Sequence, residues 1–159
     1  MTCSSLKKLP DHDDNVFPES IQLQDLPEII SSDALAFGAG RTHLIETLIS
    51  ENQGNAWLLR QNNLIAGLAL GREGRKFNQI GPVIADNFTD ARMLIKQVLR
   101  NYIDKPMVAD VPDDKVELIE WLGTLGFISQ RHFVRMYQHT NPFPGNRDKQ
   151  YLICGPEFG

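Results

Sequence analysis

The residue types that most often carry chemistry are few in this chain and widely spaced. Two cysteines, Cys3 and Cys154, stand near opposite ends of the 159 residues, and neither belongs to a CxxC pair. A disulfide framework or a structural zinc site needs more cysteines at closer spacing. The four histidines (His12, His43, His132 and His139) show no HExxH-type spacing. We therefore expect no bound metal and two free thiols. Cys154 is expected to be a buried, inert thiol rather than an acylated one.

Three arginines are candidates for binding an anionic substrate or a phosphate, or for ion pairs inside the fold: Arg41, Arg72 and Arg135. The acidic partners available for such pairs are Asp33 and Asp110. Asp33 and Arg41 flank a predicted helix junction, so we favour an anchoring ion pair between these two residues.

Composition and charge limit the function further. The formal net charge is −4, from 16 basic and 20 acidic side chains, with no dense basic run. This disfavours nucleic acid as a partner, because its binding requires many phosphates to be neutralised. No apolar run reaches the roughly 18 residues of a membrane-spanning helix, and no apolar segment of the kind found in secretory signals follows the first residues. We expect a cytoplasmic protein with no membrane partner.

The elements that must position these residues are predicted from hydrophobic spacing. We expect a flexible lead-in over residues 1–20 and one domain over residues 21–159. The first half is expected to contain a helix at 41–51, a hairpin of strands at 56–59 and 64–70, and a third strand at 77–85. Within the third strand, Gly81–Pro82 marks either a bulge or edge position, or a plain turn between two short strands.

The second half alternates helices and strands. We expect a helix from Asp86 or Asn87 to about Ile103, a strand at 107–111, a helix to about Leu125, a final strand at 127–137 and a short apolar tail. Asp114 and Glu117 resemble an acidic variant of the capping box. The order predicts a mixed sheet covered by helices, with two strand-helix-strand units that imply parallel pairing.

Several short motifs lie along this order of elements. They are D-x-x-x-F-G-x-x-R from Asp33 to Arg41, G-R-x-G from Gly71 to Gly74, Q-I-G-P-V-I-A-D from Gln79 to Asp86, D-V-P from Asp110 to Pro112, L-G-F from Leu125 to Phe127, and R-M at Arg135–Met136. Together they resemble the C-terminal half of tandem N-acetyltransferases of the GNAT superfamily, which use acetyl-CoA. The resemblance implies a mixed, mostly antiparallel central sheet flanked by helices (an α+β or α/β arrangement), with a split beside a bulged strand.

The resemblance also implies where acetyl-CoA, the cosubstrate, would bind. The bulged strand would pair with the pantetheine arm as if the arm were another strand. Here that strand supplies Gly81, Pro82, Val83, Ile84 and Ala85. The next helix N-terminus would receive the pyrophosphate. Here it supplies Asn87, Phe88, Thr89, Asp90, Ala91 and Arg92. The usual Q/R-x-x-G-x-G/A loop is matched only at Ala91, because Asp86 and Thr89 occupy its other key positions.

The catalytic groups common in this superfamily are absent from their usual positions. Leu122 stands where a tyrosine often reprotonates the thiolate, and the strand at 77–85 contains no acidic residue. Substitute candidates are Glu73, His132 and Tyr137. Each has a structural alternative: a solvated turn residue, a surface histidine, and a packing residue with an exposed hydroxyl. An enzyme without any of these groups would depend mainly on positioning.

Two functions compete. The first is acetyl-CoA-dependent transfer of an acetyl group to a primary amine of a small molecule or peptide, by direct attack. The alternative is a non-catalytic GNAT-like ligand-sensing or dimerisation module with a degenerate CoA site. A homodimer is compatible with both, with the tail at 151–158 completing a neighbour's sheet or covering its edge.

Overall fold

The computed structural model describes residues 1–6, 9 and 17–158. Among them, seven strands form one sheet in the order β1-β6-β5-β4-β3-β2, and β7 pairs with β5. The strands are β1 (Thr2–Cys3), β2 (Glu19–Ser20), β3 (Ala56–Gln61), β4 (Leu64–Arg72), β5 (Asn78–Ala85), β6 (Met107–Ala109) and β7 (Gln150–Leu152). The helices are α1 (Leu26–Phe37), α2 (Thr42–Glu51), α3 (Phe88–Arg100) and α4 (Val116–Thr124). The mixed, mostly antiparallel sheet flanked by helices is as expected.

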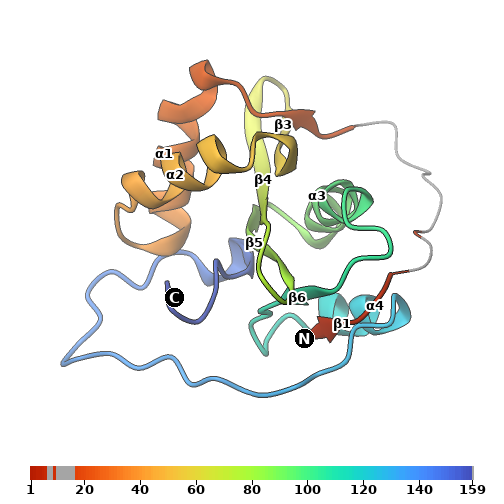
Figure 1. Ribbon diagram of the computed structural model, residues 1–159. Helices are drawn as coiled ribbons and strands as arrows, with labels where there is room; N and C mark the ends of the chain where they lie inside the picture. The colour runs from red at the N-terminus through yellow and green to blue at the C-terminus, as the bar shows by residue number, and fades with distance from the viewer. Residues whose placement is uncertain (7–8, 10–16, 159) are drawn as a thin grey trace.

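Each face of the sheet has its own hydrophobic core. Figure 1 shows α1 and α2 against one face, and α3 and α4 against the other. The core on the α1–α2 side includes Ile29, Ile45 and Leu68, and the core on the α3–α4 side includes Leu94 and Leu118. All eight residues of β5 are buried. β5 is therefore the strand around which both layers pack.

The predicted hairpin is confirmed, with a shorter turn than expected. β3 extends to Gln61 and β4 begins at Leu64, so only Asn62 and Asn63 form the turn. Both have positive φ angles, 51° and 64°. A two-residue turn of this kind matches the twist of paired strands, and asparagine tolerates the left-handed conformation better than most residues do.

The third strand contains a bulge and is continuous. Ala69 pairs with Val83, and Gly71 pairs with Ile80. Gly81 and Pro82 therefore stand opposite the single residue Leu70, which is the two-against-one arrangement of a bulge. The bulge alternative is confirmed, and the plain turn between two short strands is wrong.

The helices at 41–51 and after Asn87 are confirmed as α2 and α3. Asn87 is the N-cap residue of α3, and the apolar side of α3 is buried against the sheet. β5 and β6 pair in parallel on either side of this helix, with Asn78 opposite Met107. One of the two predicted strand-helix-strand units is therefore present.

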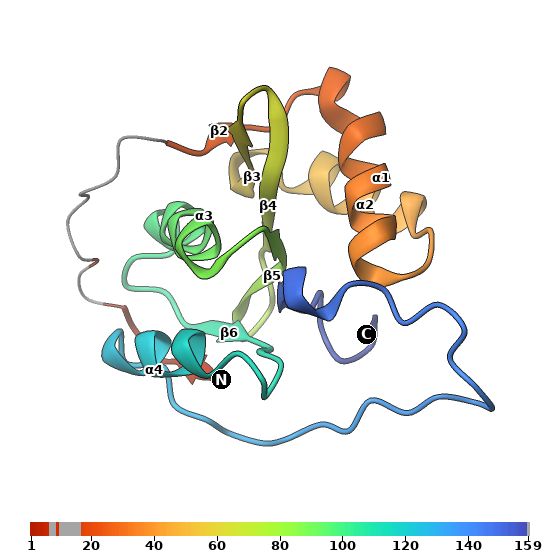
Figure 2. The same cartoon turned by 180° about the vertical axis from the view of Figure 1, so that it is seen from behind.

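The expected strand at 127–137 is wrong. Residues 129–137 lie in no strand, and Val134 and Met136 are 83% and 86% exposed. The reason is the sheet edge that this segment would need. β1 pairs with the outer edge of β6, so the segment reaches the sheet only through a single bridge between Ile128 and Thr2. Figure 2 shows the chain running on from α4 away from the sheet before it returns.

The last strand is β7, in the apolar tail. It pairs antiparallel with β5, with Leu152 opposite Val83. The tail residues expected to complete a neighbour's sheet thus complete the sheet of their own chain. The homodimer itself stays a prediction.

The sequence analysis also missed structure before residue 42. Helix α1 was not predicted, although Pro27 in its first turn and Gly38 after its end are typical helix boundaries. Within the expected lead-in, residues 2 and 3 form β1, and Cys3 and Leu6 are buried. Residues 7–8 and 10–16 of that lead-in lie outside the described residues.

The predicted capping box of α4 is wrong. The N-cap residue is Lys115, and it makes no side-chain capping hydrogen bond. The predicted stop at Gly126 is consistent with its φ of 90°, a left-handed conformation that glycine adopts without steric cost.

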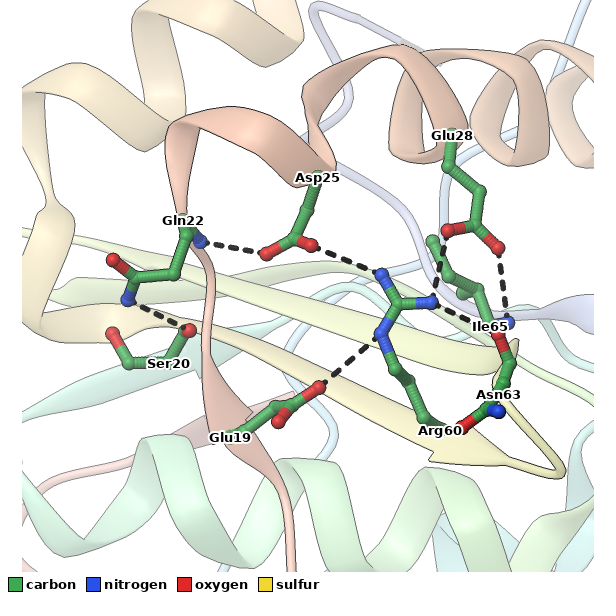
Figure 3. Close-up of polar contacts among 8 residues, drawn as sticks. All are labelled: Glu19, Ser20, Gln22, Asp25, Glu28, Arg60, Asn63 and Ile65. Atoms are coloured by element: carbon green, nitrogen blue, oxygen red, sulfur yellow. Dashed lines mark hydrogen bonds and ion pairs between the residues drawn. The ribbon is translucent and has the colours of Figure 1, made fainter.

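A cluster of charges fixes the start of α1 to the β3–β4 hairpin (Figure 3). The Arg60 guanidinium lies 3.3 Å from Glu19, 3.0 Å from Asp25 and 2.9 Å from Glu28. Glu28 also accepts a hydrogen bond from the backbone N–H of Ile65. One cation thus joins β2, the turn before α1 and α1 itself to β3. Hydrogen bonds with Glu28 and Asp25 raise the pKa of Arg60.

The expected pair between Asp33 and Arg41 is confirmed. Nε and Nη2 of Arg41 donate to the two carboxylate oxygens of Asp33 at 2.8 and 2.9 Å, and Asp33 is 1% exposed. The pair ties the C-terminal half of α1 to the start of α2. The Arg41 guanidinium also stacks on the Phe37 ring at 4.0 Å.

We expect Arg41→Ala to lower the free energy of unfolding by about 3 kcal/mol, because it leaves a buried carboxylate without its partner. Urea unfolding measures the change. The matched control is the double variant Asp33→Leu/Arg41→Met, which removes both charges and should lose clearly less stability. A loss below about 1 kcal/mol for Arg41→Ala would show that the pair does not carry the junction.

Candidate functional site

The expected split beside the bulged strand is present, and the C-terminal tail of the same chain, residues 147–158, fills it. β6 pairs with β5 only over Asn78–Ile80, before the bulge. Beyond the bulge, β7 takes the same edge of β5, where Ile84 pairs with Gln150. On its other side the tail bonds to the end of β6, because the N–H of Ile153 donates to the carbonyl of Asp110 at 3.0 Å. Beyond the bulge, both edges of β5 thus have partners.

Gly81 shows how closely the tail approaches β5. A Cβ atom at this position would collide with the carbonyl of Ile153. Gly81 also has a φ of 138°, which side chains rarely permit. The glycine of the Q-I-G-P motif therefore admits another backbone at close approach. In this structure that backbone is residues 153–154 of the same chain.

Polar contacts fix the start of the tail. Lys149 Nζ lies 2.8 Å from the Asp86 carboxylate, at the end of β5. The side-chain amide of Gln150 donates to the carbonyl of Ala36 in α1 at 2.6 Å. Lys115 Nζ donates to the carbonyl of Asp148 at 3.0 Å and lies 4.9 Å from the centre of the Tyr151 ring.

The end of the tail is fixed by Arg72. Its guanidinium donates to the carbonyl of Cys154 at 3.4 Å and to the carboxylate of Glu157 at 2.6 Å. The bond from Arg72 lowers the pKa of Glu157. Cys154 is fully buried, and burial raises the pKa of its thiol against the opposing effect of Arg41 and Arg72. The expectation of a buried thiol at this position is confirmed.

The first turn of α3 already has partners of its own. The Asn87 side chain accepts a hydrogen bond from the N–H of Asp90 at 3.0 Å. The Asp90 carboxylate accepts from the Asn87 amide at 2.7 Å and from the Gln61 amide at 2.9 Å. Burial raises the pKa of Asp90, and the nearby charge of Asp86 adds to the rise. Arg92 is the cation of this turn. Its guanidinium lies 5.9 Å from the centre of the Phe88 ring, and its buried Nε has no hydrogen-bond partner among the described residues.

The described residues do not fit acetyl-CoA in this arrangement. The edge of β5 that would pair with the pantetheine arm is hydrogen bonded to β7. The carboxylates of Asp86 and Asp90 stand where a pyrophosphate would bring further negative charge, and like charges repel. The expected residues Gly81, Val83 and Ile84 are thus at the split, but the chain's own backbone contacts them there.

A cavity of about 330 Å³ lies beside this split on the α1 side. Its floor is β4, its walls are α1 and the end of β5, and Lys149 of the tail lies at its edge. Its volume falls at the lower end of the range for small-molecule sites. Its lining includes Ser32, Leu35, Ala66, Gly67, Ile84 and Asp86.

The three catalytic candidates lie on different parts of the structure, and none of them lines this cavity. Glu73 is exposed after β4, where its backbone N–H donates to Asn52. His132 is exposed and lies 3.7 Å from the Asp113 carboxylate near α4. Tyr137 is 49% exposed beside Arg135. Leu122, at the usual tyrosine position, is fully buried in the core.

In the part of the chain that the structure describes, no three His, Cys, Asp or Glu side chains are grouped so that they could hold a metal ion. No helix among these residues has both the length and the apolar character needed to span a bilayer.

The sequence analysis missed β7 as part of the site. Residues 151–153 are Tyr, Leu and Ile, a short run of the apolar and aromatic type common in strands. Only three residues of it pair, which is too short for periodicity to show. Lys149 and Lys115 were missed as well, because their contacts depend on where β7 lies.

Comparisons with known proteins agree on the kind of domain. A family model described as an acetyltransferase (GNAT) domain matches residues 29–152. The uncharacterized N-acetyltransferase YitH of Bacillus subtilis strain 168 is 27% identical over 108 residues, which is 68% of this chain and 38% of YitH. The crystal structure of a proposed acetyltransferase from Pyrococcus horikoshii superposes with a TM-score of 0.64 at 16% identity. It covers 99% of this chain and 50% of its own. The chain spans half or less of the length of these two proteins.

We expect Asn87→Ala to destabilise the protein by about 1 kcal/mol through loss of the N-cap. The loss should be larger at pH 7 than at acid pH. Burial raises the folded pKa of Asp90, so Asp90 favours folding at low pH and opposes it as pH rises through that pKa. Removing the Asn87 amide removes a hydrogen bond that favours the charged carboxylate.

Thermal unfolding across this pH range measures both effects, with Asn87→Ser as the matched control. Serine keeps a capping oxygen but lacks the amide, so it should show the pH-dependent part without most of the capping loss. Equal losses for the two variants at every pH would contradict this account of the turn.

Proposed function

Because the chain belongs to the GNAT acetyltransferase domain family, we propose that it transfers an acetyl group from acetyl-CoA to a primary amine. The observation that carries the proposal is the bulged β5 followed directly by α3, within the residues that the family model matches. Gly81 beside the bulge admits a second backbone, at the place that residues 153–154 occupy here, and this supports a site for an extended chain-like ligand. The reaction class is attack of a neutral amine on a thioester.

We propose that the acceptor amine occupies the 330 Å³ cavity beside the split. Ser32 and the paired side chains of Asp86 and Lys149 in its lining would suit a hydrogen-bonding small molecule or peptide terminus. The candidates Glu73, His132 and Tyr137 all lie outside this lining. We therefore propose that positioning carries most of the rate enhancement, because a thioester is already activated.

A second function is favoured by one observation, the occupation of the β5 edge by β7. A domain whose cofactor groove is filled by its own tail suits a non-catalytic ligand-sensing or pairing module. The cavity would then bind an amine ligand without acetyl transfer. A homodimer is compatible with both functions and stays a proposal.

Thermal unfolding with acetyl-CoA separates the two functions. Under the first, acetyl-CoA at 100 times its dissociation constant should stabilise the protein by about 2.7 kcal/mol, and an amine panel should release free CoA. Adenosine and pantetheine, each a part of CoA, serve as ligand controls. If millimolar acetyl-CoA gives neither stabilisation nor CoA release while an amine alone stabilises the protein, the sensing function is correct.

A further inference from the structure

We propose that residues 147–154 act as an intramolecular competitor of the cosubstrate, so that acetyl-CoA binds only to molecules whose tail has left the split. This inference rests on the proposed function. It follows from the disagreement between the fold family, which implies a cofactor along β5, and the chain itself, which places β7 there. Residues 147–154 are the part of the C-terminal tail that lies in the split.

The tail follows the part of the expected cofactor path that runs along β5. Lys149 lies beside Asp86, just before the turn where the pyrophosphate was expected. It continues along Val83 and Ile84, where the pantetheine arm was expected. It then passes over Gly81, where its carbonyl at Ile153 fills the space that the glycine leaves open. One β5 edge has one set of N–H and C=O groups, so the tail and an extended ligand exclude each other.

The chemistry of the tail complements the split at both of its ends. Lys149 supplies a cation next to the Asp86 carboxylate. This cation is attracted to the negatively charged turn, whereas a pyrophosphate would be repelled by it. Backbone groups of Leu152 and Gln150 supply the strand pairing. The acidic residues that disfavour the cosubstrate thus favour the tail.

The tail is held from outside the split by a residue that can be changed without altering β5. Lys115 donates to the Asp148 carbonyl and stacks over Tyr151. If only a fraction of molecules has the tail displaced, the apparent dissociation constant is the intrinsic one divided by that fraction. Weakening the Lys115 contacts raises the fraction and therefore tightens apparent binding of acetyl-CoA.

The chain contains a natural reporter of tail position and an internal control. Cys154 in the tail and Cys3 in β1 are both free and buried. Displacement of the tail exposes Cys154. Cys3 is held separately, because β1 pairs it with Met107 of β6. Global unfolding exposes both. Alkylation by iodoacetamide, read by peptide mass spectrometry, distinguishes the two events, and acetyl-CoA has no free thiol to consume the reagent.

The test combines this labelling with calorimetric titration of acetyl-CoA into the full chain and into Lys115→Met. The matched control is Lys105→Met, which removes a lysine that lies 5.6 Å from the Tyr102 ring and outside the tail. We expect acetyl-CoA to speed the labelling of Cys154 and not of Cys3. We also expect Lys115→Met to bind acetyl-CoA about 3- to 10-fold more tightly than the unchanged chain, as weakening of tail docking predicts, and Lys105→Met to bind as the unchanged chain does.

The outcomes separate this inference from the function on which it rests. Binding of acetyl-CoA with Cys154 still protected, or with Lys115→Met unchanged, overturns the inference and leaves the acetyltransferase proposal in place. Labelling of both cysteines together also overturns it, because the ligand would then select unfolded molecules. Failure of acetyl-CoA to bind both the full chain and Lys115→Met overturns both proposals.

Discussion

The rest of the structure depends on one constraint: β5 is buried on both faces and paired along both edges. All eight of its residues are buried, between α1 and α2 on one face and α3 and α4 on the other. Buried backbone N–H and C=O groups require partners. The bulge at Gly81–Pro82 ends the pairing with β6 halfway along the strand. Something must therefore pair with the second half, and in this chain β7 does so.

The same requirement explains why other segments of the sheet lie where they do. β1 occupies the outer edge of β6, although it has only two residues, and Cys3 and Leu6 bring apolar surface into the core beside it. The outer edge of β6 is then occupied, and residues 129–137 lie in no strand. Their aromatic and β-branched character is satisfied neither by pairing nor by burial, and Val134 and Met136 remain exposed. Strand propensity shows which segments could join the sheet. The segments that do join it are those that reach an open edge.

The elements that local sequence determines were predictable, and those that depend on competition were not. The Asn62–Asn63 turn, the amphipathic face of α3 and the Asp33–Arg41 pair follow from residue types and spacing, and each is present. The bulge was predictable only as one of two alternatives, because the choice depends on the register with β4. The strand at 127–137 was assigned from composition, but β1 occupies the edge of β6 that it would need. β7 was missed because only three residues form it, and its pairing depends on the edge of β5 that the bulge leaves open.

The role of the charged residues at the site was equally hard to predict from the sequence. Asp86 in the expected phosphate turn indicated a poor match to an anionic ligand, and that indication came from the sequence alone. Its partner Lys149 lies 63 residues away in the chain and 2.8 Å away in space. The carboxylate that weakens the case for a pyrophosphate therefore has a definite role in holding the tail. A departure from a family motif has a physical meaning only once the group that contacts the changed residue is known. Here that group is the chain's own tail rather than a ligand.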